Sequence, residues 1–275
     1  KLYIVATPIG NLKDISLRAL EILASVDLVA AEDTRHTRRL LDHFEIKQKL
    51  IAFHDHNERR QTDLLVDRIK AGESVALVSD AGTPLISDPG FRLVRAARAA
   101  DVVVEAVPGA SALTAALSVS GLPTDQFQFL GFLPAKGRAT RLAEVSQYPG
   151  TIILYEAPHR MASLLETVLE VLGGDRELVI CRELTKLYEQ VVQGLAGEVR
   201  DQMIRGEIPA RGEFVVLISG ATIVQSVAQI ELDDCLRLLI AELPISKAAE
   251  LAGKMLGLKR NLVYKRALAL KAEAG

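Results

Sequence analysis

Short apolar segments that alternate with segments of helical periodicity constrain the fold of this chain more than any other feature. Each apolar segment in the first part of the chain is followed by a polar turn and then by an amphipathic stretch. Strands that alternate with helices are typical of α/β folds. We expect strands at residues 2–6, 28–31, 50–53, 75–78 and 102–106, and helices at 17–24, 34–43, 58–71 and 91–100.

A second α/β unit follows a glycine- and proline-containing hinge at residues 121–125. Its expected strands are residues 127–132, 152–155, 178–181, 190–193 and 214–218, with a linker at 220–229. The tail is predicted to form three helices, at 232–243, 246–256 and 261–274, with Gly257 before the last one. Such a module resembles a helix-turn-helix. The expected domains are therefore residues 1–120, 121–220 and 231–275.

The composition limits the function in three ways. The chain has 275 residues and a formal net charge of -2, so any contact with nucleic acid must come from local basic patches. The two cysteines, Cys181 and Cys235, show no metal-ligand spacing and are expected to be reduced core thiols. No apolar run is long enough for a membrane span, and we expect a cytoplasmic protein without a metal or a membrane partner.

Three turns that follow expected strands are candidates for parts of one ligand pocket. They are residues 7–11, 80–84 and 108–112, and each exposes main-chain groups near the start of a helix. Such turns suit a ligand bound mainly through main-chain hydrogen bonds, such as a nucleoside. They contain neither a dinucleotide-binding nor a triphosphate-binding glycine motif. Beyond the second turn, Asp88 is predicted to be the N-cap of the next helix, with Pro89 at its first position.

Polar side chains also cluster after other strands. Asp33 can cap the following helix, or Asp33, Arg35 and His36 can lie at the mouth of a cleft. Similar clusters occur at residues 155–160 and 182–186, and each is either a solvated rim or part of a site. Residues 134–141 form a basic loop that either contacts phosphates or keeps the surface soluble. Residues 254–271 contain six basic and no acidic residues, which favours contact with nucleic acid.

With these residues in view, the chain resembles, over nearly its whole length, the tetrapyrrole-methylase superfamily. It is most similar to the branch of bacterial methyltransferases that modify the ribose 2′-oxygen of a cytidine in small-subunit ribosomal RNA. The matching segments are residues 3–12, 31–37, 79–90, 131–134, 182–186 and 258–265. The resemblance implies a two-domain fold of the class III S-adenosylmethionine (SAM) methyltransferases with a small helical C-terminal module.

The resemblance also implies where the ligands bind. SAM would lie in the cleft between the two α/β domains, and the protein would be a homodimer that acts on 16S rRNA, within the 30S subunit. The implied cofactor contacts are Pro8, Asp80, Gly82, Thr83, Pro84, Ile86, Ser111, Ala112, Leu133 and Tyr155. The expected contacts to the RNA backbone are Arg35, Lys136, Arg138, Arg160, Arg182 and Lys186, with Lys259, Arg260 and Lys265 in the tail.

The reaction is expected to be an in-line attack of a ribose hydroxyl on the sulfonium methyl group, assisted by a general base. Asp33, His36 and Glu156 are the candidates, and no spacing rule decides among them. If Asp33 is the base, Asp33→Ala should reduce turnover far more than cofactor affinity. Two alternatives remain open, a methyltransferase that acts on carbon atoms of a corrin precursor and a DNA-binding regulator that senses a nucleoside.

Overall fold

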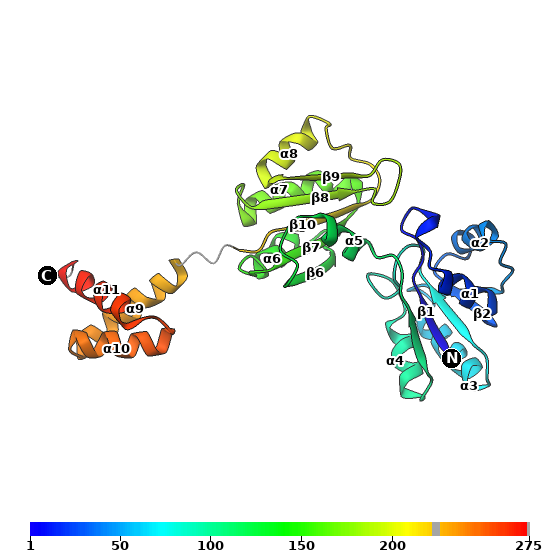
Figure 1. Ribbon diagram of the computed structural model, residues 1–275, viewed down its shortest axis with the longest axis horizontal. Coiled ribbons are helices and arrows are strands. Elements are labelled where there is room, and N and C mark those ends of the chain that lie inside the picture. Colours follow the sequence, from blue (N-terminus) through cyan, green and yellow to red (C-terminus); the bar gives the residue numbers. More distant parts are fainter. Residues whose placement is uncertain (222–225, 274–275) are drawn as a thin grey trace. The chain divides into compact units, whose positions relative to one another are not determined.

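The computed structural model describes residues 1–221 and 226–273 and divides the chain into two compact units, Lys1–Gly220 and Ala221–Gly275 (Figure 1). Within the first unit, two sheets define two lobes. The first lobe comprises β1 to β5 with α1 to α4, and the second comprises β6 to β10 with α5 to α8. Part of the expected linker, residues 222–225, lies outside the described residues.

The first lobe is built on a five-stranded parallel sheet of order β3-β2-β4-β1-β5. Helices α1 and α2 cover one face, where Leu23 and Leu41 are buried against Val29. Helices α3 and α4 cover the other, where Leu65 and Leu93 are buried against Leu77. The strands are β1 (Leu2–Val5), β2 (Leu28–Ala31), β3 (Leu50–Ala52), β4 (Val75–Val78) and β5 (Val104–Val107), and the helices are α1 (Leu17–Ser25), α2 (Thr34–His43), α3 (Glu58–Lys70) and α4 (Phe91–Ala99), with the 3-10 helix η1 (Leu12–Asp14) after β1.

The second lobe is built on a mixed sheet of order β6-β7-β10-β8-β9, in which β6 and β7 are parallel and the other pairs antiparallel. Helices α6, α7 and α8 cover one face of this sheet. Helix α5 (Ala112–Val119) packs against the other face. The strands are β6 (Phe127–Phe132), β7 (Thr151–Glu156), β8 (Glu177–Arg182), β9 (Gln190–Leu195) and β10 (Phe214–Ile218), and the helices are α6 (Arg138–Glu144), α7 (Met161–Leu172) and α8 (Ala196–Ile204), with η2 (Pro158–Arg160) before α7.

The face of the second sheet that carries α5 is shared between the lobes. Ile9, from the turn after β1, is buried in the same apolar cluster as Ala116, Val179 and Leu217. Although the expected boundary at residue 120 assigned α5 to the first domain, this helix packs against the second sheet. The turn after β1, at the carboxyl end of the parallel sheet, therefore packs against the second sheet.

The C-terminal unit contains three helices, α9 (Ser226–Glu242), α10 (Ile245–Leu256) and α11 (Arg260–Glu273). They enclose a small core that includes Leu236, Ala252 and Val263. Gly257 ends α10 in the left-handed conformation, at φ 66°, and the chain turns there into α11. The expected glycine turn before the last helix is confirmed. Among the described helices, none combines the length and apolar character needed to cross a bilayer.

One local prediction is wrong. Helix α4 begins at Phe91 with Gly90 as its N-cap, so Asp88 does not cap it and Pro89 is not helical. The cap comes instead from α3, where the Glu58 carboxylate accepts hydrogen bonds from the main-chain N–H of Gly90 and of Arg92, at 3.0 and 3.2 Å. The Glu58 carboxylate, which is distant in the sequence, thus takes the capping role that was predicted for Asp88.

Candidate active site

A cavity of about 400 Å³ lies where the two lobes meet. The first lobe contributes the turns that follow β1, β2 and β4, and Ser111 and Ala112 line the cavity at the start of α5. The second lobe contributes the ends of β7, β8 and β10. Ligands of open α/β sheets bind at the carboxyl ends of the strands, and ligand pockets have volumes of about 300–1,000 Å³. The cavity has the place and the size of a ligand site.

Two main-chain hydrogen bonds and one from a side-chain hydroxyl hold the three predicted turns together. The N–H of Thr7 donates to the carbonyl of Gly82 at 2.9 Å, and the N–H of Gly82 donates back to the carbonyl of Thr7 at 3.0 Å. The Thr83 hydroxyl donates to the carbonyl of Ala110 at 3.1 Å. A side chain at Gly109 has no room, because its Cβ would lie 2.9 Å from that of Ala6. The turns after β1, β4 and β5 therefore form one continuous wall.

The same wall carries three carboxylates, those of Glu32, Asp80 and Asp88. Two of them link the turns after β2 and β4, because Asp80 accepts from the N–H of Asp33 at 3.0 Å and Glu32 accepts from the N–H of Asp80 at 3.4 Å. Burial raises the pKa of Glu32. Burial, with the nearby charge of Glu32, raises the pKa of Asp88 to about 6. Close, partly desolvated carboxyls favour a cationic ligand.

The opposite wall is aromatic. Tyr155 packs edge-on against Phe129 and Phe132, with ring centroids 4.8 and 5.6 Å apart. Burial raises the pKa of the Tyr155 phenol, which stays protonated. Tyr155 and Phe132 line the cavity opposite the acidic turns. A ligand with both a cationic group and a flat apolar ring would find a matching surface on each side.

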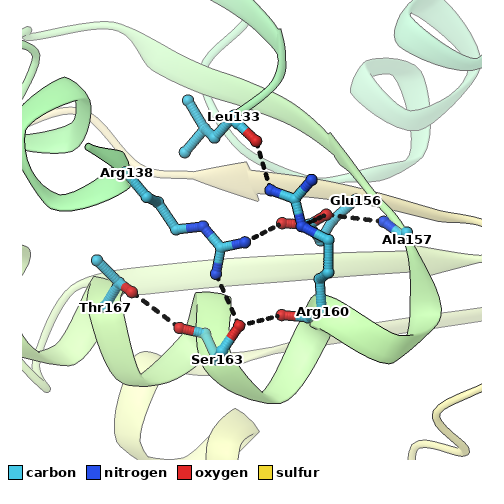
Figure 2. Close-up of polar contacts among 7 residues, drawn as sticks. All are labelled: Leu133, Arg138, Glu156, Ala157, Arg160, Ser163 and Thr167. Carbon is cyan, nitrogen blue, oxygen red and sulfur yellow. Dashed lines mark hydrogen bonds and ion pairs between the residues drawn. The ribbon is translucent and has the colours of Figure 1, made fainter. Parts of the chain in front are cut away.

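Next to Tyr155 at the end of β7, Glu156 lies between two arginines (Figure 2). Its carboxylate is 3.1 Å from Nη2 of Arg138 and 3.1 Å from Nε of Arg160, and it accepts from the N–H of Ala157 at 2.9 Å. Arg138 also donates to the Ser163 hydroxyl at 2.8 Å, and Arg160 donates to the carbonyl of Leu133. These contacts tie the loop after β6 to the starts of α6 and α7.

The structure brings most of the expected cofactor residues to the cavity. Of the ten, seven line it: Asp80, Gly82, Thr83, Ile86, Ser111, Ala112 and Tyr155. Pro8 and Pro84 are buried neighbours of lining residues, and the Leu133 side chain is buried in the core of the second lobe. The turns identified in the sequence are thus the turns that form the wall.

The three candidate bases are placed differently. Asp33 is the N-cap of α2 and forms a two-point ion pair with Arg35, and these hydrogen bonds lower the pKa of its carboxyl strongly. His36 is exposed on α2. Neither lines the cavity. Glu156 does, but it is 2% exposed and its oxygens are engaged by the two arginines. The carboxylates of Asp33 and Glu156 are thus held in ion pairs, and the imidazole of His36 lies outside the cavity.

Two of the expected RNA contacts need correction. Arg138 is 8% exposed and bound to Glu156, and Arg182 is 6% exposed, donating to the carbonyls of Arg211 and Tyr188. Both guanidinium groups belong to the interior of the second lobe, where burial requires them to be paired. They are therefore not available to phosphates.

The remaining basic residues keep some exposure. Arg35 and Lys136 are exposed, and Arg160 is partly exposed. The amino group of Lys186 lies 2.8 Å from both Glu183 and Glu213, and its stem packs over Gly10 of the first lobe. In the C-terminal unit, Lys259, Arg260 and Lys265 are exposed at the start of α11.

Sequence reasoning missed several cavity residues. Glu32 precedes the cluster identified after β2, and Asp88 was interpreted as a helix cap. Nothing in the sequence indicated the segment at the start of β10, because its approach to the cavity depends on the order of the second sheet. The missed residues are Glu32, Ser87, Asp88, Phe132, Cys181 and the segment 212–215, whereas Ile9 and Leu184 lie in the turn 7–11 and the cluster 182–186 that the sequence had indicated.

The cysteines carry no disulfide, and both thiols are free. Burial raises the pKa of Cys181, which lines the cavity, to about 12, so it stays protonated. Cys235 is only partly buried. In residues 1–221 and 226–273, His, Cys, Asp and Glu side chains form no group of three or more suited to hold a metal ion.

Comparisons with known proteins agree with this architecture. The model of the tetrapyrrole (corrin/porphyrin) methylases matches residues 1–200, and that of the RsmI C-terminal helix-turn-helix domain matches residues 226–271. A diphthine synthase superposes with a TM-score of 0.62 at 16% identity, covering 83% of this chain and 93% of the other. A Thermus thermophilus uroporphyrin-III C-methyltransferase, solved with S-adenosylhomocysteine, superposes with a TM-score of 0.56 at 19% identity, covering 80% of this chain and 97% of the other.

The chain belongs to the tetrapyrrole methylase family, in the branch whose members carry the name ribosomal RNA small subunit methyltransferase I. A relative of that name from Pseudomonas aeruginosa is 51% identical over 271 residues, which are 97% of this chain and 96% of the relative. The expected fold class and family are confirmed. SAM, the methyl donor of this class of enzyme, is the cofactor.

The residues present fit this cofactor. SAM carries a sulfonium and an ammonium group, and Glu32, Asp80 and Asp88 supply negative charge on one wall. Its adenine and ribose suit the turns at Thr83 and Ser111 and the aromatic wall at Tyr155. The fit rests on the chemistry of the cavity, which combines acidic, main-chain and aromatic surfaces.

Proposed function

We propose that this protein transfers a methyl group from SAM to the ribose 2′-hydroxyl of a cytidine in 16S rRNA, within the 30S subunit. The observation that carries the proposal is an acidic cavity suited to a sulfonium, in a chain whose full-length relatives are named as small-subunit rRNA methyltransferases. The 30S subunit is a cytoplasmic particle, so we place the reaction in the cytoplasm. We further propose that the enzyme works as a homodimer.

The residues of the chain contribute mainly orientation. When bound, SAM supplies an electrophilic methyl carbon on a positively charged sulfur. Main-chain hydrogen bonds join the turns at Thr7 and Gly82, and the Thr83 hydroxyl donates to the carbonyl of Ala110 in the third turn, so the cavity wall is preorganised. Holding two reactants in a reactive geometry can lower a barrier by about 7–11 kcal/mol. The network around Glu156 fixes the loops that border the other wall.

The C-terminal unit is proposed to bind RNA through the start of α11. Lys259, Arg260 and Lys265 are exposed there, and Tyr264 is 39% exposed between them. Positive side chains beside an exposed aromatic ring are typical of nucleic-acid contacts. Arg35, Lys136, Arg160 and Lys186 are proposed as a second set of contacts around the cavity.

The test of the function uses labelled SAM and small subunits from cells that lack the enzyme, with free 16S rRNA in parallel. We expect label in 16S rRNA of assembled subunits, at a nucleotide that resists alkaline cleavage, because methylation blocks the 2′-oxygen that attacks the phosphate. Label on a base, or transfer to a corrinoid acceptor instead of RNA, would contradict the proposal. Light scattering of the pure protein tests the homodimer.

The role of α11 is tested by replacing Lys259, Arg260 and Lys265 together with alanine. We expect weaker binding to the 30S subunit and a smaller dependence of affinity on salt, by about 0.7–0.9 in the log–log slope for each lost phosphate contact. SAM binding should not change. Lys247→Ala is the control, because this cation on α10 lies outside residues 254–271 and pairs with Glu250. An unchanged salt slope in the triple variant would exclude this role.

A further inference from the structure

Arginine side chains gather at the starts of α3 and α4. Both helices follow parallel strands of the first sheet, so both begin at its carboxyl edge, where the cavity lies. The Glu58 carboxylate at the start of α3 accepts from the main-chain N–H of Gly90 and of Arg92, which joins the two helix starts. Arg59 and Arg60 follow Glu58 directly, and both are exposed. The cations of the two helices therefore lie on one surface.

An exposed aromatic ring lies among these cations. Phe91 is the first residue of α4 and is 66% exposed. Arg95 is one helical turn further along α4 and lies on the same face as Phe91. Phe91 comes four residues after Ser87, which lines the cavity, and four residues span at most about 14 Å. We call this surface next to the cavity the basic rim, and it consists of Arg59, Arg60, Phe91, Arg92 and Arg95.

The fold makes little use of the cations of the basic rim. Within residues 1–221 and 226–273, no side-chain hydrogen bond or ion pair holds Arg59, Arg60 or Arg95. Arg92 makes one long ion pair, at 3.6 Å from Glu58, and its side chain is 65% exposed. These guanidinium groups are therefore available to an anionic ligand.

Exposed arginines of the second lobe are placed differently. Arg200 lies 2.7 Å from Asp201 and 3.2 Å from Glu166, and Arg205 lies 2.6 Å from Glu207. Each of these cations is matched by an acidic side chain, so neither adds free positive charge to the surface. The comparison shows that exposure alone does not leave an arginine without a partner.

The helix dipole does not explain the basic rim either. The start of a helix carries partial positive charge, so a cation there lowers the stability of the helix. Arg59 and Arg60 lie in the first turn of α3, and the first turn of α4 has Arg92 and no acidic residue. Cations that work against the fold at both helix starts indicate a role in binding.

The charge of the cavity gives a reason for cations at its edge. Glu32, Asp80 and Asp88 make the first-lobe wall acidic, as a cationic cofactor requires. An RNA strand carries a negative charge on every phosphate, so a strand that brings one ribose to this cavity meets like charge. Exposed arginines beside the entrance would offset this repulsion.

We propose that the basic rim binds the RNA strand next to the target nucleotide. The proposal rests on the proposed methylation of 16S rRNA. The arginines contact phosphates, and the Phe91 ring stacks on a base of the strand. A ring stacks only on a base whose face is open, so the strand is unpaired at that nucleotide. Because Glu58 already accepts from the main-chain donors at the start of α4, the guanidinium groups and not the helix end hold the phosphates.

The first experiment replaces Arg59, Arg60 and Arg95 together with alanine. Arg92 is kept, because its main-chain N–H takes part in the cap of α4 and its side chain pairs with Glu58. Binding to unmodified 30S subunits is measured over a series of salt concentrations. We expect an affinity about tenfold weaker at low salt and a log–log salt slope smaller by about 0.7 for each lost phosphate contact.

Two controls accompany the triple variant. Arg200→Ala with Arg205→Ala removes cations that acidic side chains already neutralise, and should keep the wild-type affinity and salt slope. Affinity for S-adenosylhomocysteine should change less than about twofold in the triple variant, because the three replaced arginines do not line the cavity. The rate of methyl transfer at saturating subunits should stay within a few-fold of the wild type, with the loss confined to KM.

The second experiment separates stacking from charge at Phe91. Phe91→Ala should weaken binding to the subunit by about 5- to 150-fold, the range of one lost base–aromatic stack, and leave the salt slope unchanged. Phe91→Tyr keeps the ring and should bind within about twofold of the wild type. Phe91→Leu keeps an apolar side chain without a ring, so wild-type affinity in this variant would contradict stacking.

The third experiment tests whether the bound strand is unpaired. A short single-stranded RNA and a duplex that contains the same sequence compete with the 30S subunit for the wild type and for Phe91→Ala. The single strand should be the stronger competitor for the wild type, and most of this advantage should be lost in Phe91→Ala. A duplex that competes as well as the single strand would contradict an unpaired site.

The outcomes distinguish this proposal from the proposed function. A wild-type protein that transfers no methyl group to the subunits overturns the proposed methylation, whatever the basic rim binds. An active wild type, with an unchanged affinity and salt slope in the triple variant, overturns the RNA surface alone. Light scattering covers the remaining occupant, because a change of oligomeric state in the triple variant would assign the basic rim to contact with a second copy of the chain.

Discussion

The two walls of the cavity differ in how their buried charges are arranged: the charges of one are clustered and alike, and those of the other are paired. On the first-lobe wall, Glu32, Asp80 and Asp88 lie close enough for like charges to raise the pKa of Asp88. On the second-lobe wall, Glu156 is matched by two arginines. Paired charges stabilise a fold, whereas clustered like charges keep a site ready for a cation or a proton. The contrast indicates that Glu156 stabilises the fold, whereas the carboxylates of the first wall are placed to meet a ligand.

The largest expected effect is at Glu156. Glu156→Ala leaves Arg138 buried without its carboxylate, and loss of one partner of a buried pair costs about 3–5 kcal/mol. Denaturant melts of the variant should show this loss. Glu144→Ala, which removes an exposed carboxylate beside Arg141, should cost under 1 kcal/mol. Similar losses of stability in Glu156→Ala and Glu144→Ala would show that the pairing of Glu156 contributes no more to the fold than an exposed ion pair.

Removal of the Asp88 carboxylate should raise the stability of the protein, which is opposite to the effect expected at Glu156. Its carboxyl has a pKa of about 6 in the folded protein against 3.8 when solvated, so the folded state binds more protons between these values. Stability from this group is therefore present at low pH and is lost as the pH rises toward 6. A shift of about two units is worth about 3 kcal/mol, and solvent screening of this half-buried group reduces it to about 1–2 kcal/mol.

Asp88→Asn is accordingly expected to be more stable than the wild type at pH 7 by about 1–2 kcal/mol, with the difference vanishing near pH 4. Thermal melts at several pH values measure it. A residue that serves a ligand site rather than the fold often lowers stability, so its substitution can raise it. An Asp88→Asn protein destabilised at pH 7 would instead indicate that Asp88 is a structural residue.

The smallest effect is expected at Asp33. Asp33→Ala removes the N-cap of α2 and its ion pair with Arg35, at a cost of about 1 kcal/mol. Asp33→Asn keeps a capping acceptor and should recover most of this loss. Because Asp33 does not line the cavity, methyl transfer should stay within a few-fold of the wild type. A hundredfold loss of turnover in both variants would restore Asp33 as a candidate base.

The sequence by itself was sufficient to predict the strands, the helices of the first lobe and of the tail, and the turns that form the cavity wall. Apolar segments and helical periodicity were sufficient to predict every strand found in residues 1–221 and 226–273, because these signals are local. The turns at Thr7, Gly82 and Ser111 were identified because small residues directly after a strand expose the main chain. The glycine turn at Gly257 and the three-helix tail followed from the same local signals.

The tertiary structure decided which polar groups are available. Asp33 and Asp88 both precede helices and look alike in the sequence, but only the first is a cap, because Glu58 from another helix supplies the cap of α4. Arg138 and Arg182 look like surface cations, but partners distant in the chain hold them inside the second lobe. A residue type fixes what a side chain can bind, whereas the packing of distant segments fixes which partner it meets and whether water reaches it.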